Sequence, residues 1–113
     1  MAGVDVRSFD ASDDELTSEK ARADRIDVGG RTVWKCTFEP GWRYTEHFEP
    51  ELCTAPHVAY VASGRLHIVM KDGTEAEASP GSVVVIEPGH DAWTVGDEPC
   101  VFIDFGESLA AVE

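Results

Sequence analysis

Four histidines and three cysteines carry the most specific chemistry in this chain of 113 residues. A neutral imidazole binds divalent metals or moves protons near neutral pH, and a thiolate is a soft metal ligand or a nucleophile. Only Cys53 and His57 are close in sequence, four residues apart, so the others join a site only if the fold brings distant segments together. The histidines are His47, His57, His67 and His90, and the cysteines are Cys36, Cys53 and Cys100.

The elements that must position these residues are predicted to be β-strands. Short runs of β-branched and aromatic residues alternate with turn pairs such as Ser63-Gly64, Asp72-Gly73 and Pro80-Gly81. Too little sequence separates the runs for crossover helices, so we expect an all-β, antiparallel sandwich or barrel. Strands are predicted at roughly 31–39, 42–48, 56–62, 65–71, 74–78, 82–86, 90–95 and 99–105.

The chain is expected to form one domain with a polar N-terminal segment. Residues 1–25 are rich in Asp, Ser and Glu and are predicted to be an arm, and residues 26–113 the β-barrel domain. Within the arm, the stretch 13–23 is compatible with a short helix or a loop, because its apolar stripe is thin.

Three of the histidines are predicted to share strand faces with small side chains. Side chains alternate between the two faces of a strand, so each imidazole has room beside it for an ion or a ligand if its face points into the barrel. His67 instead shares its face with Arg65 and Val69, and a structural or surface role is expected for it. The shared faces are Arg43, Thr45 and His47; His57, Ala59 and Val61; and His90, Ala92 and Thr94.

Two segments of the chain resemble the two sequence motifs of the cupin family. Gly41 followed after five residues by His47, and His57 followed after six by Gly64, are similar to the first motif. The run from Pro80-Gly81 to Glu87-Pro88-Gly89-His90 is similar to the second motif. The resemblance covers about residues 30–106 and implies a double-stranded β-helix, or jelly-roll barrel.

The resemblance implies a divalent metal held by His47, His57 and His90. The family's first motif has a second histidine that this chain lacks, and either Glu49 or Cys53 is expected to replace it. Cys53 would shift the preference toward Zn, and Glu49 toward Fe, Mn or Ni. No organic cofactor is predicted.

Two classes of function follow from this reading. The first is a metal-dependent enzyme acting on a small organic molecule through a metal-bound oxygen, with oxygenase, isomerase, lyase or cyclase chemistry. Arg43, which can bind a substrate carboxylate, and Glu49 are its candidate catalytic residues. The alternative is a noncatalytic module that binds a metabolite or metal as a sensor or accessory protein.

Charge and cysteine usage limit the partners. The formal net charge is −13, and no Lys or Arg follows Lys71, so neither nucleic acid nor an anionic membrane is an expected partner. An odd number of widely spaced cysteines suits a reducing compartment, and we expect a soluble cytoplasmic protein. The family resemblance and the alternating run from Val4 to Phe9 favour a homodimer.

Overall fold

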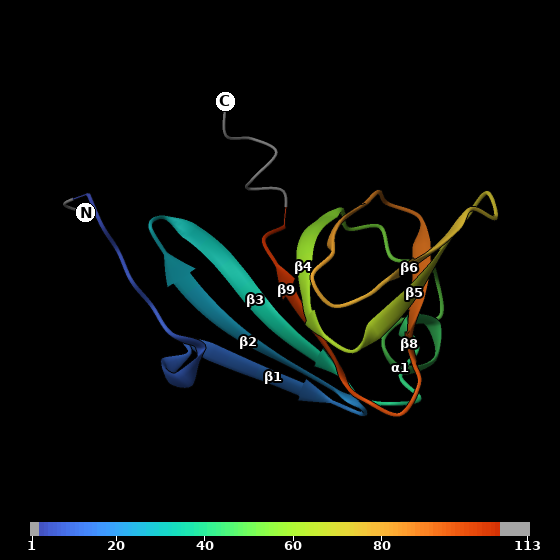
Figure 1. Cartoon of the computed structure of the whole chain (residues 1–113), viewed down its shortest axis with the longest axis horizontal. Coiled ribbons are helices and arrows are strands. Elements are labelled where there is room, and N and C mark those ends of the chain that lie inside the picture. Colours follow the sequence, from blue (N-terminus) through green and yellow to red (C-terminus); the bar gives the residue numbers. More distant parts are fainter. Residues whose placement is uncertain (1–2, 107–113) are drawn as a thin grey trace.

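Two antiparallel sheets form the molecule in the computed structural model, which describes residues 3–106. The larger sheet has the strand order β1-β2-β3-β9-β4-β7 and the smaller has the order β6-β5-β8 (Figure 1). The strands are β1 (Asp14–Ser18), β2 (Ala21–Val28), β3 (Arg31–Phe38), β4 (His57–Ser63), β5 (Arg65–Met70), β6 (Glu75–Ala78), β7 (Val83–Ile86), β8 (His90–Val95) and β9 (Cys100–Asp104). This arrangement confirms the predicted all-β, antiparallel jelly-roll barrel.

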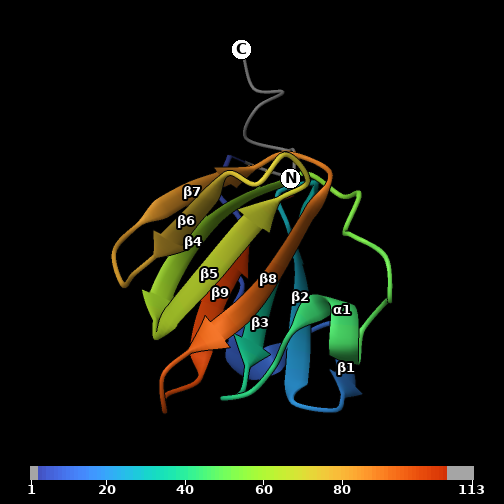
Figure 2. The same ribbon diagram turned by 90° about the vertical axis from the view of Figure 1, so that its right-hand side faces the viewer.

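The two sheets face each other, and the apolar core lies between them. In Figure 2, β5 and β8 lie in front of the strands of the larger sheet, with the short helix α1 (Tyr44–His47) beside β8. Alternate residues of β9 and β4 point inward, as the period of a strand requires. Ala59, Val61, Cys100 and Phe102 are all buried as a result.

The N-terminal segment adds β1 and β2 to the larger sheet. β1 pairs with β2 from Asp14↔Arg25 to Ser18↔Ala21, and β2 pairs along its whole length with β3. A helix within 13–23 is therefore wrong, because both halves of that stretch join the ladder. Every residue of β1 is exposed, and a single-turn 3-10 helix (Phe9–Ala11) precedes it.

The strand predicted at 42–48 is also wrong, since this segment contains α1. The physical reason is a buried carboxylate on β8. Asp91 accepts hydrogen bonds from the backbone N–H and the hydroxyl of Thr45, at 3.2 and 2.9 Å, and draws the segment into a turn against the strand. Residues three and four apart then lie on one face, so the strand alternation expected for 43, 45 and 47 does not apply.

Gly64 shows why the turn between β4 and β5 requires glycine. Its φ is +70°, a conformation that glycine adopts without steric cost. A Cβ at this position would overlap the carbonyl oxygen of Pro99, so the chain leading into β9 packs directly on the glycine backbone. This close approach packs the chain before β9 against the end of β4.

Candidate metal centre

Cys53, His57 and His90 meet at one end of an internal cavity. Their ligand atoms all lie within 4.8 Å of one another, with Cys53 and His57 four residues apart and His90 from a distant segment. His57 is the first residue of β4 and His90 the first residue of β8. Backbone hydrogen bonds tie Cys53 to β8, because its N–H donates to the His90 carbonyl at 2.8 Å and its carbonyl accepts from Gly89 at 2.7 Å.

The imidazole of His57 is oriented by a carboxylate. Its Nδ1 lies 2.7 Å from Oδ2 of Asp104, and its Nε2 lies 3.7 Å from the Sγ of Cys53. With the proton on Nδ1, the lone pair of Nε2 faces the site. Burial lowers the pKa of His57, but the hydrogen bonds to Asp104 and Cys53 outweigh it and leave the pKa above its usual value.

The imidazole of His90 is oriented by the backbone. Its Nδ1 donates to the carbonyl oxygen of Glu87 at 2.8 Å, which leaves Nε2 available to a metal. The two rings meet edge to face, with centroids 5.2 Å apart. Burial is the main reason that the pKa of His90 lies below its usual value, and the nearby His57 adds to it. A lowered pKa keeps the ring neutral, as metal binding requires.

The structure places His47 and Glu49 away from this group. His47 lies at the end of α1, where its Nδ1 accepts the Arg43 backbone N–H at 3.0 Å. Glu49 is exposed just after the helix. Among residues 3–106, neither belongs to the cluster of ligand atoms nor lines the cavity.

Arg43 lies on the outer side of β8. Its Nε donates to Oδ2 of Asp91 at 2.8 Å, and its guanidinium carbon lies 4.7 Å from the ring centre of Trp93. The Asp91 carboxylate is buried, which raises its pKa, but its hydrogen bonds from Arg43 and Thr45 outweigh burial and lower the pKa overall. Arg43 thus fastens the segment before α1 to β8.

His67 also lies on the outer side, in the structural role expected from the sequence. Its ring stacks on Trp93 with centroids 4.6 Å apart, and its Nε2 lies 2.7 Å from Oε1 of Glu75. Arg43, Trp93, His67 and Glu75 together form what we call the outer cluster.

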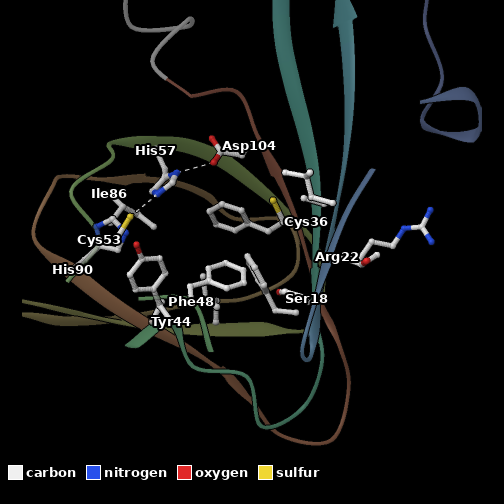
Figure 3. A pocket seen from close by; sticks show the side chains of 18 residues that line it. Ser18, Arg22, Cys36, Tyr44, Phe48, Cys53, His57, Ile86, His90 and Asp104 are labelled. Atoms are coloured by element: carbon white, nitrogen blue, oxygen red, sulfur yellow. Dashed lines mark hydrogen bonds and ion pairs between the residues drawn. The ribbon is translucent and has the colours of Figure 1, made fainter. Parts of the chain in front are cut away.

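The cavity beside Cys53, His57 and His90 has a volume of about 370 Å³. Figure 3 shows these three residues at one end of it and Ser18 and Arg22 at the other. The hydroxyl of Tyr44 points toward Cys53 in the same view. Partial burial, and then the charge and hydrogen bond of Cys53, raise the pKa of Tyr44 to about 12, so the phenol stays protonated at neutral pH.

The other two cysteines are free thiols without a ligand geometry. Cys36 lines the cavity from β3, and burial, followed by the charges of Asp104 and Asp24, raises its pKa to about 12. Burial raises the pKa of Cys100 to about 11. Both therefore remain protonated and unreactive at neutral pH.

Sequence reasoning missed Asp104 and Tyr44. A signal for Asp104 exists, because Cys100, Phe102 and Asp104 alternate on one face of β9, and a carboxylate on an apolar inward face needs a partner. Tyr44 gives no comparable signal. Its position depends on α1, whereas the sequence predicts a strand at 42–48.

The donor set fits a transition metal. One thiolate and two imidazoles suit Zn²⁺, and in both histidines the second nitrogen is held by a carboxylate or a carbonyl, the arrangement usual around metal-bound histidines. A metal held by these three ligands would keep a coordination position for water or substrate. All three ligand residues line the cavity.

Residues 34–106 match the family described as the Cupin domain, and the chain belongs to that family. A search of the curated proteins gives no match. Among residues 3–106 no helix has the length and apolar character to cross a bilayer.

Solved structures share the fold. The polyketide cyclase RemF from Streptomyces resistomycificus is 18% identical, with a TM-score of 0.66 over 88% of this chain and 75% of that one. A sugar phosphate isomerase of the cupin superfamily from Silicibacter pomeroyi is 20% identical, with a TM-score of 0.66 over 88% and 73%. The protein VPA0057 of unknown function from Vibrio parahaemolyticus is 17% identical, with a TM-score of 0.65 over 84% and 99%. At these identities the similarity establishes the architecture alone.

Proposed function

We propose that this chain is a metal-dependent enzyme that transforms a small organic molecule bound in the cavity. The observation that carries the proposal is the convergence of Cys53, His57 and His90 at one end of that cavity, which we call its inner end. Asp104 and the Glu87 carbonyl hold the two imidazoles with Nε2 available, so the site is organised before a metal binds.

The donor set favours zinc over the other metals considered from the sequence. A thiolate is a soft ligand, and among residues 3–106 neither Glu49 nor another carboxylate joins the three donors to favour Fe, Mn or Ni. Bound zinc supplies Lewis-acid polarisation of an oxygen atom and no redox chemistry. Among the reaction classes considered, this supports isomerase, lyase or cyclase activity over oxygenase activity, and two similar folds are described as a polyketide cyclase and a sugar phosphate isomerase.

The chain's own residues supply orientation and a proton donor. The Tyr44 hydroxyl lies beside Cys53 on the cavity wall and, as a neutral phenol, donates a hydrogen bond to a bound molecule. Asp104 keeps the proton of His57 on Nδ1. Phe38 and Phe102 add apolar rings to the cavity wall, with Phe102 edge to face with His57, and so limit the water around a bound molecule.

The decisive experiment measures metal content by elemental analysis and anomalous scattering. Wild-type protein is expected to bind one zinc ion, and His57→Ala to lose roughly nine-tenths of it, because losing a ligand costs more than the 10–100-fold typical of a supporting residue. His67→Ala, a histidine of the outer cluster, is the matched control and should keep its metal. Equal metal in His57→Ala and wild type would refute the site.

A spectroscopic readout tests the thiolate separately. Protein loaded with Co²⁺ is expected to show a sulfur-to-metal charge-transfer band, and Cys53→Ser to lose it while both imidazoles remain. Metal-loaded protein that binds ligands tightly without changing them would instead make the chain a noncatalytic binding module.

A further inference from the structure

Most polar groups of the cavity lie near its two ends. Tyr44, Cys53, His57, His90 and Asp104 lie at the inner end, and Ser18 and Arg22 lie at the outer end (Figure 3). Apart from Thr17 and the thiol of Cys36, the rest of the described wall is made of hydrocarbon and aromatic side chains: Leu16, Ala21, Ala23, Phe38, Phe48, Leu66, Ile86, Ala92 and Phe102. A molecule in this space therefore contacts mainly apolar side chains between its ends.

Apart from a metal held by the three ligands at the inner end, the described wall offers no free cation for an anionic ligand. Arg22 is the one Lys or Arg side chain in that wall, and its guanidinium is bound to Asp24 at 3.0 Å and Glu15 at 2.7 Å. Figure 3 shows the Arg22 side chain extending away from the cavity. Asp104 places a carboxylate at the inner end, and the net charge of −13 repels anions over the whole molecule. Away from the metal site, a phosphate or carboxylate group therefore meets no free Lys or Arg side chain in the described wall.

The size and the walls of the cavity suit a ring. A volume of about 370 Å³ lies near the lower end of the roughly 300–1,000 Å³ typical of ligand pockets. Phe48 meets both Phe38 and Tyr44 edge to face, with centroids 6.4 and 5.6 Å apart. Phe102 lies edge to face with His57 at 6.2 Å. These rings provide faces and edges to an aromatic or unsaturated ligand.

We infer that the cavity binds a largely apolar molecule of one or two rings, with no charged group other than a single oxygen or nitrogen donor directed at Cys53, His57 and His90. This inference names the substrate class of the proposed function and rests on it. The apolar wall contacts the rings of the ligand, and the inner end of the cavity binds its one polar atom.

Calorimetric titration of zinc-loaded protein tests the inference with two probes. 2-Naphthol is an uncharged two-ring compound with one hydroxyl group, and glucose 6-phosphate is a polar anion. We expect saturable 1:1 binding of 2-naphthol and none of glucose 6-phosphate under the same conditions. Metal content is measured on every sample, so a failure of the metal site is seen independently of the ligand result.

Ala23→Phe is the variant that fills the cavity. Ala23 lies on β2 opposite Leu16 and Cys36, which both line the same space. The larger side chain is expected to weaken 2-naphthol binding roughly tenfold or more while zinc binding is kept, because the metal ligands lie at the other end. Ala76→Phe, at an exposed position on β6 outside the cavity wall, is the matched control and should bind as wild type does.

Leu16→Lys serves as a second variant at a position that tolerates change. Leu16 is 55% exposed on β1, so the substitution spares the core while placing a charge on the apolar wall. We expect at least roughly threefold weaker 2-naphthol binding. Glucose 6-phosphate binding in wild type without 2-naphthol binding would overturn the inference, as would full 2-naphthol affinity in both cavity variants. Absence of zinc with 2-naphthol still bound would refute the metal centre and leave the apolar ligand class supported.

Discussion

Strand β8 carries a cluster of side chains on each of its faces. The two clusters differ in which ring nitrogens and charged groups keep an atom available to a ligand. On the inner face, His90 joins Cys53 and His57, and each imidazole has one nitrogen fixed and one facing its neighbours. On the outer face, Trp93 is covered by Arg43 and His67, which are themselves bound to Asp91 and Glu75.

The difference shows that residue type alone does not define a binding site. Both clusters contain histidine beside a carboxylate. In the outer cluster the charged side chains are paired and the rings are stacked, so the cluster stabilises β8. The inner cluster pairs only the atoms that set orientation, and it leaves a thiol and two imidazole nitrogens within reach of one ion.

Removal of metal should affect stability through the inner cluster alone. A metal ion at 100 times its Kd adds about 2.7 kcal/mol to the free energy of unfolding of a protein that binds it only when folded. For a domain of this size that corresponds to a rise in Tm of roughly 10–20 °C. Thermal unfolding with zinc and after chelation measures the shift, which His90→Ala should abolish and His67→Ala should retain. An equal shift in His90→Ala would mean that the metal binds elsewhere.

Asp104→Asn should weaken zinc binding by roughly 10–100-fold. Oδ1 of Asp104 accepts the Gly106 N–H at 2.7 Å, so the amide oxygen of an asparagine is held there and its NH₂ faces Nδ1 of His57. The imidazole proton then moves to Nε2 and blocks the lone pair that faces the site. Glu75→Gln makes the same change beside His67 in the outer cluster. Competition with a chromogenic chelator compares the two, and equal affinities would show that Asp104 has no orienting role.

Arg43→Ala should lower stability while leaving zinc affinity unchanged. Asp91 has a side chain only 4% exposed and loses a charged donor, although the hydrogen bonds from Thr45 remain. The expected cost is about 1–2 kcal/mol in the free energy of unfolding, discounted because Arg43 is itself partly exposed. Arg65→Ala, which breaks an exposed pair with Glu77, should cost less than about 0.5 kcal/mol. Urea denaturation and zinc titration give the two quantities, and a loss of zinc affinity in Arg43→Ala would assign this residue to the site.

Most of the barrel was predictable because strands and turns leave local patterns. The strands around His57, His67 and His90 lie close to where alternation and turn residues put them. The residues that share a face with His57 and with His90 followed from the same alternation. Those predicted for His47 did not, because its segment forms α1, in which Thr45 donates hydrogen bonds to Asp91 on β8.

The site was predictable only in part. Cys53 and Glu49 were alternatives for one role, and their short distance along the chain gave no means of choosing. The backbone pairing of Cys53 with Gly89 and His90 brings the thiol to the two imidazoles, whereas Glu49 ends exposed after α1. Arg43 has the chemistry to bind a carboxylate, but Asp91 and Trp93 hold it on the outer face.

The sequence by itself determined the class of fold, the alternation of the barrel strands and which residues share a face with His57 and His90, because each depends on neighbours a few residues away. Only the tertiary structure decided that these faces point inward, that Cys53 joins the two histidines, that Asp104 orients His57 and that Tyr44 faces the cavity. Asp104 is far from His57 in the chain. Cys53 is only four residues before His57 but is placed by its backbone pairing with His90, so the geometry depends on how the two sheets and the loop before β4 pack together.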